Sequence, residues 1–188
     1  GVRRLADVAV VLFDLDGTLV DTVEMIRASM RNATATVLGE QLPDEVLMRN
    51  VGIPLRAQMR ELSEEHAEEL LRVYRAHNAL VHDEMIRAYP GTNEALDRLA
   101  DTGVRMGVVT SKSRPVAERA LDLFGLGTYF DLVVACEDTE RHKPDPYPLL
   151  WALKRLGASP ETCAYVGDSP HDMAAARGAG TVAVGAAW

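Results

Sequence analysis

The strongest chemical signal in the sequence is a pair of aspartates, Asp14 and Asp16, in the segment Asp14–Thr18. The pair directly follows the apolar run Val8–Phe13, which is typical of a buried strand. Two carboxylates two positions apart repel each other unless a cation or a proton lies between them. Gly17 permits the sharp turn that brings Asp16 back over the same place. The pattern therefore favours a carboxylate site at a strand end over an ordinary acidic turn.

Two further segments carry groups that suit an anion. Thr110 and Ser111 end a second apolar run, where hydroxyls beside a helix N-terminus can hold a phosphoryl oxygen. Taken alone they also suit helix N-caps. Lys143 is expected to open a proline-led helix, although lysine usually prefers the opposite helix end. A lysine there favours a bound anion, with a solvated side chain as the alternative.

A third aspartate, Asp168, follows another apolar run and is expected to join Asp14 and Asp16 at the same sheet edge. The three acidic side chains, distant in sequence, would then share one divalent cation beside Lys143. Asp172 lies one helical turn further, where it would bind a metal-bound water or orient Lys143.

The elements that position these residues alternate between strand and helix. Alternation of this kind predicts an α/β fold, a Rossmann-like parallel sheet covered by helices on both faces. Besides Val8–Phe13, the expected strands are 104–109, 132–134, 163–166 and 182–184. The expected helices between them are 91–100, 115–124 and 146–156.

Residues 21–88 interrupt the alternation with helix formers and no convincing strand. We expect helices over 22–38, 55–62 and 64–81, and a hinge near Tyr89–Gly91. The stretch is too long for a loop within a compact domain. The sequence therefore predicts a core domain of residues 1–20 and 89–188 and an inserted α-helical domain of residues 21–88.

Composition limits the partners. The chain has 188 residues and a formal charge of −8, which argues against non-specific nucleic-acid binding. No apolar run approaches the length of about 18 residues that a membrane span needs. The two cysteines, Cys136 and Cys163, have no partner at metal-binding spacing, so a reducing, cytoplasmic compartment is expected.

Together these segments resemble the four motifs of the haloacid dehalogenase superfamily of phosphohydrolases, in order and over nearly the whole chain. One departure is Ser111, where many relatives carry Asn. The resemblance implies that Asp14 is the nucleophile that forms an aspartyl-phosphate and that Asp16 is the general acid and base. It implies that Mg²⁺ is bound by Asp14, by Asp168 and by the backbone carbonyl of Asp16. Thr110, Ser111 and Lys143 resemble the residues that hold the phosphoryl group.

The inserted helices resemble the family's α-helical cap, which closes over the site and favours small phosphorylated metabolites over nucleic acids. Within the capped enzymes the chain is similar to phosphoglycolate phosphatases, whose activity is the first expectation, and to the related bacterial pyrophosphatases, whose activity is the alternative. Residues 74–78 and 82–84 look closer to the pyrophosphatase branch. Arg56 resembles a cap residue that meets a second anionic group of the substrate, and a solvated helix arginine is the alternative.

Two other activities remain open from the sequence. A phosphosugar mutase would use the same aspartyl-phosphate and return the group to its substrate. A phospho-aspartate receiver would be a signalling module on a similar sheet, but such modules lack the helical insert. The oligomeric state, monomer or homodimer, is open, and so is the question of a further helix beyond Trp188.

Overall fold

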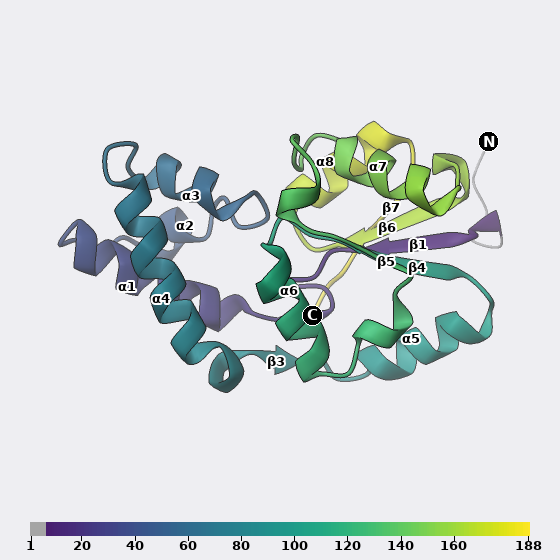
Figure 1. The fold of residues 1–188 in the computed structure, drawn as a ribbon, viewed down its shortest axis with the longest axis horizontal. Coiled ribbons are helices and arrows are strands. Elements are labelled where there is room, and N and C mark those ends of the chain that lie inside the picture. Colours follow the sequence, from purple (N-terminus) through teal and green to yellow (C-terminus); the bar gives the residue numbers. More distant parts are fainter. Residues whose placement is uncertain (1–6) are drawn as a thin grey trace.

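The centre of the molecule is a five-stranded parallel sheet (Figure 1), seen in a computed structural model that describes residues 7–188. Its strands are β1 (Val10–Phe13), β4 (Arg105–Val109), β5 (Leu132–Val134), β6 (Cys163–Gly167) and β7 (Val182–Gly185). Their order is β5-β4-β1-β6-β7, so β1 pairs with β4 on one side and β6 on the other. The predicted parallel α/β sheet is confirmed.

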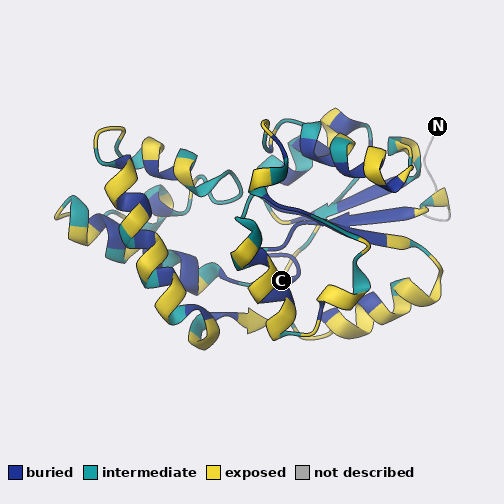
Figure 2. Cartoon of the chain, in the orientation of Figure 1, coloured by how far each residue is buried: buried dark blue, intermediate teal, exposed yellow. Residues whose placement is uncertain are grey.

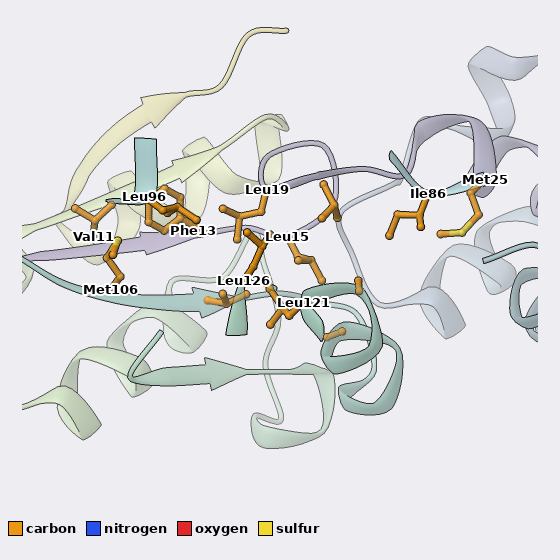
Figure 3. Packing of buried hydrophobic residues seen from close by; sticks show 14 residues of the cluster. Val11, Phe13, Leu15, Leu19, Met25, Ile86, Leu96, Met106, Leu121 and Leu126 are labelled. Atoms are coloured by element: carbon orange, nitrogen blue, oxygen red, sulfur yellow. The ribbon is translucent and has the colours of Figure 1, made fainter. Parts of the chain in front are cut away.

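Helices cover both faces of this sheet. Alternate side chains of β1 point to opposite faces, and those on each face pack against a different pair of helices. Val11 and Phe13 belong to one buried cluster, drawn in Figure 3, whereas Val10 and Leu12 belong to another. The first cluster includes residues of α5 (Thr92–Asp101) and α6 (Arg114–Leu123), and the second includes residues of α7 (Tyr147–Leu156) and α8 (Pro170–Ala179). The central strands β1, β4 and β6 are accordingly mostly buried (Figure 2).

A separate group of helices follows β1 and lies to one side of the sheet (Figure 1). We call α1 to α4 the helical insert. Its members are α1 (Val23–Val37), α2 (Asp44–Leu47), α3 (Leu55–Leu62) and α4 (Ala67–Met85). They share their own apolar cluster, which includes Ile26, Met30, Met59 and Leu70. The insert is therefore held together by contacts among its own helices.

Three details differ from the sequence-based expectation. The insert is joined to the sheet by two short antiparallel strands, β2 (Val20–Asp21) and β3 (Arg87–Ala88), where no strand was expected. Strands of two residues and the four-residue α2 are too short to show a hydrophobic period. Helix α7 begins at Tyr147, so Lys143 lies in the preceding loop and does not open the helix. Pro146 disfavours helical geometry at the residue before it, and Asp145 Oδ1 accepts the Tyr147 N–H at 2.8 Å.

Short 3-10 helices lie in the connecting loops: η2 (Gly127–Tyr129), η3 (Cys136–Asp138) and η4 (Pro160–Thr162). Within residues 7–188, no helix is both long enough and apolar enough to span a membrane.

Candidate active site

The polar residues singled out in the sequence meet at the carboxyl edge of the sheet. Asp14 follows β1, Thr110 follows β4 and Asp168 follows β6. Since β1 lies between β4 and β6, the three strand ends are neighbours. This edge is where open α/β sheets bind their ligands.

Three carboxylates form a compact group there. One oxygen each from Asp14, Asp168 and Asp172 lies within 4.8 Å of the other two. Asp14 is buried and accepts the Leu15 N–H at 2.8 Å, while Asp168 accepts the Thr18 hydroxyl at 3.2 Å. Hard oxygen ligands at this spacing suit a divalent cation such as Mg²⁺.

Gly17 allows Asp168 to approach the loop after β1. The residue has a φ of 75°, in the left-handed region that glycine adopts without strain. A Cβ atom on Gly17 would lie 2.1 Å from Oδ2 of Asp168, which is a severe overlap. The glycine in the first motif is thus required by a carboxylate that is 151 positions further along the chain.

The side chain of Asp16 does not belong to the carboxylate group. Its Oδ1 accepts the Thr22 hydroxyl at 2.8 Å and pairs with Nζ of Lys112 at 3.0 Å. The carboxylate that joins those of Asp14 and Asp168 is that of Asp172, and ligation of a cation by Asp16 stays a prediction. The turn at Gly17 sends the carboxylate of Asp16 toward the insert, and the backbone carbonyl of Asp16 is left as a candidate ligand.

Lys143 lies beneath the group and is almost completely buried. Its Nζ is 3.1 Å from Oδ1 of Asp14 and 2.8 Å from Oδ1 of Asp172. The ammonium also donates to the Tyr165 hydroxyl at 2.8 Å and to the Val109 carbonyl at 3.3 Å. Asp172 therefore orients Lys143, which is one of the two roles considered for it.

The pKa shifts in this group have identifiable causes. Burial raises the pKa of Asp14 well above its usual value, with Lys143 opposing it and the neighbouring carboxylates adding to it. Burial and then Asp172 raise the pKa of Asp168. Burial alone would lower the pKa of Lys143, but the carboxylates of Asp14 and then Asp172 outweigh it and raise this pKa. Burial alone would raise the pKa of Asp172, but Lys143 outweighs it and lowers this pKa. Lys143 thus offsets the charge of Asp172, whereas the pKa values of Asp14 and Asp168 stay raised.

Thr110 and Ser111 lie in the loop after β4, as expected. Thr110 is buried, and its Oγ1 accepts the Lys112 N–H at 3.1 Å. Ser111 is partly exposed next to it. Ser113 is the N-cap of α6, so this loop leads directly into a helix N-terminus.

Arg56 is not brought to the carboxylate group. It is exposed on α3 and forms an ion pair with Glu68 in the first turn of α4. This geometry matches the alternative of a solvated helix arginine. Arg56 does not reach the carboxylate group, because it lies on the surface of α3 and has an acidic partner within the insert.

The insert reaches the site through other residues. Tyr74 on α4 is buried in the insert's own apolar cluster, and burial and then the charge of Asp16 raise its pKa. A Cβ atom on Gly52, in the loop before α3, would lie 3.1 Å from Oγ of Ser169 and 3.4 Å from Cδ2 of His171. Within the insert, Nδ1 of His77 on α4 lies 3.1 Å from the hydroxyl of Ser29 on α1, which links these two helices.

The sequence reasoning missed Lys112, Thr22 and Tyr165 as members of this network. Lys112 directly follows Thr110 and Ser111, and that adjacency was the available signal. Tyr165 lies within an apolar strand, so nothing in its neighbours distinguishes it from a core residue. Thr22 begins the expected helix and resembles an ordinary helix start.

Comparisons with known proteins agree with this site. Residues 11–186 match the family described as haloacid dehalogenase-like hydrolase. The chain is 40% identical over 181 residues to pyrophosphatase PpaX of Bacillus velezensis, covering 96% of this chain and 84% of that protein. It is 38% identical over 174 residues to pyrophosphatase PpaX of Halalkalibacterium halodurans, covering 93% and 81%.

Solved structures give the same picture. A haloacid dehalogenase-like hydrolase from Bacteroides fragilis superimposes with a TM-score of 0.88 at 29% identity, covering 95% of this chain and 87% of that one. A structure from Haemophilus somnus, named as a predicted phosphoglycolate phosphatase, has a TM-score of 0.86 at 26% identity and covers 95% and 85%. The chain therefore belongs to the haloacid dehalogenase-like hydrolases and is an enzyme that hydrolyses phosphate esters.

Proposed function

We propose that this enzyme hydrolyses inorganic pyrophosphate through an aspartyl-phosphate intermediate. The observation that carries the proposal is the approach of Asp14, Asp168 and Lys143 to one another at the sheet edge. The choice of pyrophosphate is supported by the relatives of 40% and 38% identity, which are named pyrophosphatases. The small phosphorylated ester 2-phosphoglycolate is the second candidate, favoured by the Haemophilus somnus structure of 26% identity.

In this proposal Asp14 attacks phosphorus and the leaving oxygen takes a proton from Asp16. Lys143 and Thr110 hold the oxygens of the transferred phosphoryl group, and Ser111 lies beside them as a further donor. The attack needs positive charge nearby because both the nucleophile and the substrate are anionic. Lys143 supplies one such charge at 3.1 Å from Asp14.

The residues present fit Mg²⁺. Asp14 and Asp168 are close together and their pKa values are raised by burial and by neighbouring carboxylates, which is the environment that a cation relieves. Asp14, Asp168 and the backbone carbonyl of Asp16 would hold the ion. When bound, Mg²⁺ neutralises the phosphate and the nucleophile. Asp172 is not assigned to the ion, because its Oδ1 pairs with Lys143 and its Oδ2 accepts the Asp168 and Ser169 N–H groups at 3.2 and 3.1 Å.

We propose further that residues 21–88 act as a cap over a core made of residues 1–20 and 89–188. The close approach of Gly52 to Ser169 and His171 of the core supports this role. A cap that closes on the site excludes bulk water and large substrates. Both cysteines within the described chain are free thiols, which fits a cytoplasmic enzyme.

The test is phosphate release from a panel of pyrophosphate, 2-phosphoglycolate, sugar phosphates and nucleoside monophosphates with Mg²⁺. We expect pyrophosphate to give the highest kcat/KM, without any bisphosphate primer. Release of phosphate that depends on such a primer would instead identify a mutase. A higher kcat/KM for 2-phosphoglycolate would replace pyrophosphate as the substrate.

Asp14→Asn serves as the inactive variant, with an expected loss of at least about 10⁴-fold in kcat. Asp131→Asn is the matched control, because Asp131 is half-exposed before β5 and pairs with Arg105. Both variants should keep the circular dichroism spectrum of the wild type. Near-normal turnover in Asp14→Asn would rule out the nucleophile assignment.

A further inference from the structure

Lys112 is a mostly buried lysine whose position is defined by its surroundings. Its N–H donates to Oγ1 of Thr110 at 3.1 Å, and its carbonyl accepts the Cys136 N–H at 2.9 Å. The side chain is 11% exposed and its Nζ lies 3.0 Å from Oδ1 of Asp16. The ammonium is therefore held beside the carboxylate that serves as the acid in the proposed reaction.

The two oxygens of Asp16 have different surroundings. Oδ1 accepts the Thr22 hydroxyl at 2.8 Å and pairs with Lys112. Oδ2 has no hydrogen-bond partner among the residues that the structure describes. An acid needs one oxygen within hydrogen-bond reach of the leaving group, about 2.6–3.2 Å. Oδ2 is the oxygen left for this contact, and the ammonium of Lys112 lies against Oδ1 of the same carboxylate.

The charge balance at Lys112 differs from that at Lys143. Lys143 lies between the carboxylates of Asp14 and Asp172. Lys112 has Asp16 as its one carboxylate partner within residues 7–188. The two ammonium groups therefore differ in their surroundings: Lys143 lies beside Asp14, whereas Lys112 lies beside Asp16, the acid in the proposed reaction.

We propose that Lys112 is a specificity-determining residue that binds an anionic group on the leaving half of the substrate. The proposal rests on the proposed phosphoryl transfer and deepens it, because it names a substrate class: phosphate compounds whose leaving group carries a phosphate or carboxylate. A substrate whose leaving group is a neutral alcohol offers the ammonium of Lys112 no such anionic partner. Attraction between opposite charges in a water-poor site is stronger than in bulk water.

The bonds in this step balance without any further reactant. The bond between Asp14 and phosphorus forms as the bond between phosphorus and the leaving oxygen breaks. The electron pair of the broken bond stays on that oxygen, which receives the proton from Asp16. Lys112 gives up no proton and forms an ion pair with the departing anion.

The experiment compares substrates that differ in the charge of the leaving group. One pair is 2-phosphoglycolate and its neutral amide, which have nearly the same shape, and pyrophosphate and an aryl phosphate form the second. In Lys112→Met we expect kcat/KM for each anionic substrate to fall about 10- to 100-fold more than for its neutral counterpart. Part of the loss should appear as a higher KM. Lys112→Arg should regain much of the preference, because it restores the charge.

The preference is a ratio measured on one protein sample, so partial unfolding of Lys112→Met would not change it. Lys154→Met is the matched control, because Lys154 is exposed on α7. It should keep the wild-type ratio. An equal loss on charged and neutral substrates would overturn the proposal and reduce Lys112 to a residue that positions Asp16. A wild-type enzyme that hydrolyses no substrate of either pair would instead overturn the proposed function, and this inference with it.

Discussion

Lys143 and Asp172 form an ion pair that is shut off from solvent, with Nζ 2.8 Å from Oδ1 and side chains that are 1% and 0% exposed. Two charges taken out of water are stable only where their remaining hydrogen bonds are satisfied. Lys143 meets that condition through Asp14 and Tyr165, and Asp172 through Ser169. The pair links the loop before α7 to the start of α8 and holds a positive charge beside Asp14.

Lys143→Met should lower both activity and stability. Asp172 would be left as a buried carboxylate without its cation, so we expect a loss of about 3–5 kcal/mol in the free energy of unfolding. The kcat for phosphate release should fall about 10²- to 10³-fold, because a preorganised donor to the phosphoryl group is gone. Urea denaturation and steady-state kinetics measure the two effects.

The double variant Lys143→Met/Asp172→Leu separates them. Replacing a whole buried ion pair by apolar side chains is often neutral for stability, so part of the lost stability should return while activity does not. Exposed Lys154→Met again serves as the control. A Lys143→Met protein with the same free energy of unfolding as the wild type would contradict the predicted contribution of this ion pair to stability.

Metal binding should change how stability depends on pH. The pKa values of Asp14 and Asp168 are raised in the folded, metal-free chain above the usual value of 3.8. The folded state therefore holds more protons than the unfolded state, so the stability from these groups is full below that value and is lost as the pH rises through the raised values. We expect the metal-free protein to lose stability from about pH 4 toward neutral pH for this reason.

Mg²⁺ should reverse the loss at neutral pH, since it binds the ionised carboxylates. At an Mg²⁺ concentration of about 100 times Kd the gain is about 2.7 kcal/mol, and it should be much smaller near pH 4. Thermal unfolding in Mg²⁺ and in excess chelator measures this difference. Asp168→Asn should abolish the Mg²⁺-dependent gain, and its persistence in that variant would remove Asp168 from the ligand set.

Gly52→Ala should impair closure of the insert on the core. Gly52 has a φ of 115°, and an added methyl group would lie 3.1 Å from Oγ of Ser169. If the insert acts as the proposed cap, kcat/KM should fall about 10- to 100-fold, because a small displacement of groups near the reacting atoms is costly to catalysis. Gly39→Ala is the matched control: its φ is 70°, with no atom within 4 Å of the added group. Equal losses in both variants would show that backbone strain, and not the contact with Ser169, is responsible.

The sequence by itself determined the elements that have a clear local signal. Apolar runs such as Val8–Phe13 predict buried strands because a strand covered on both faces needs apolar side chains on both. The strand-and-helix alternation then brings Asp14, Thr110 and Asp168 to one sheet edge, since parallel strands point the same way. Helices α1, α3 and α4 of the insert were also predictable, because they are long enough to show a period, whereas α2 is not.

Only the tertiary structure decided which side chains meet. The turn at Gly17 directs the carboxylate of Asp16 to Thr22 and Lys112 and away from Asp14 and Asp168. Arg56 pairs with Glu68, and Tyr165 joins Lys143 from within an apolar strand. Side-chain partners of this kind depend on loop direction and on the packing of distant segments. A local pattern contains neither, and so residue types and spacing could name the candidates but could not assign their contacts.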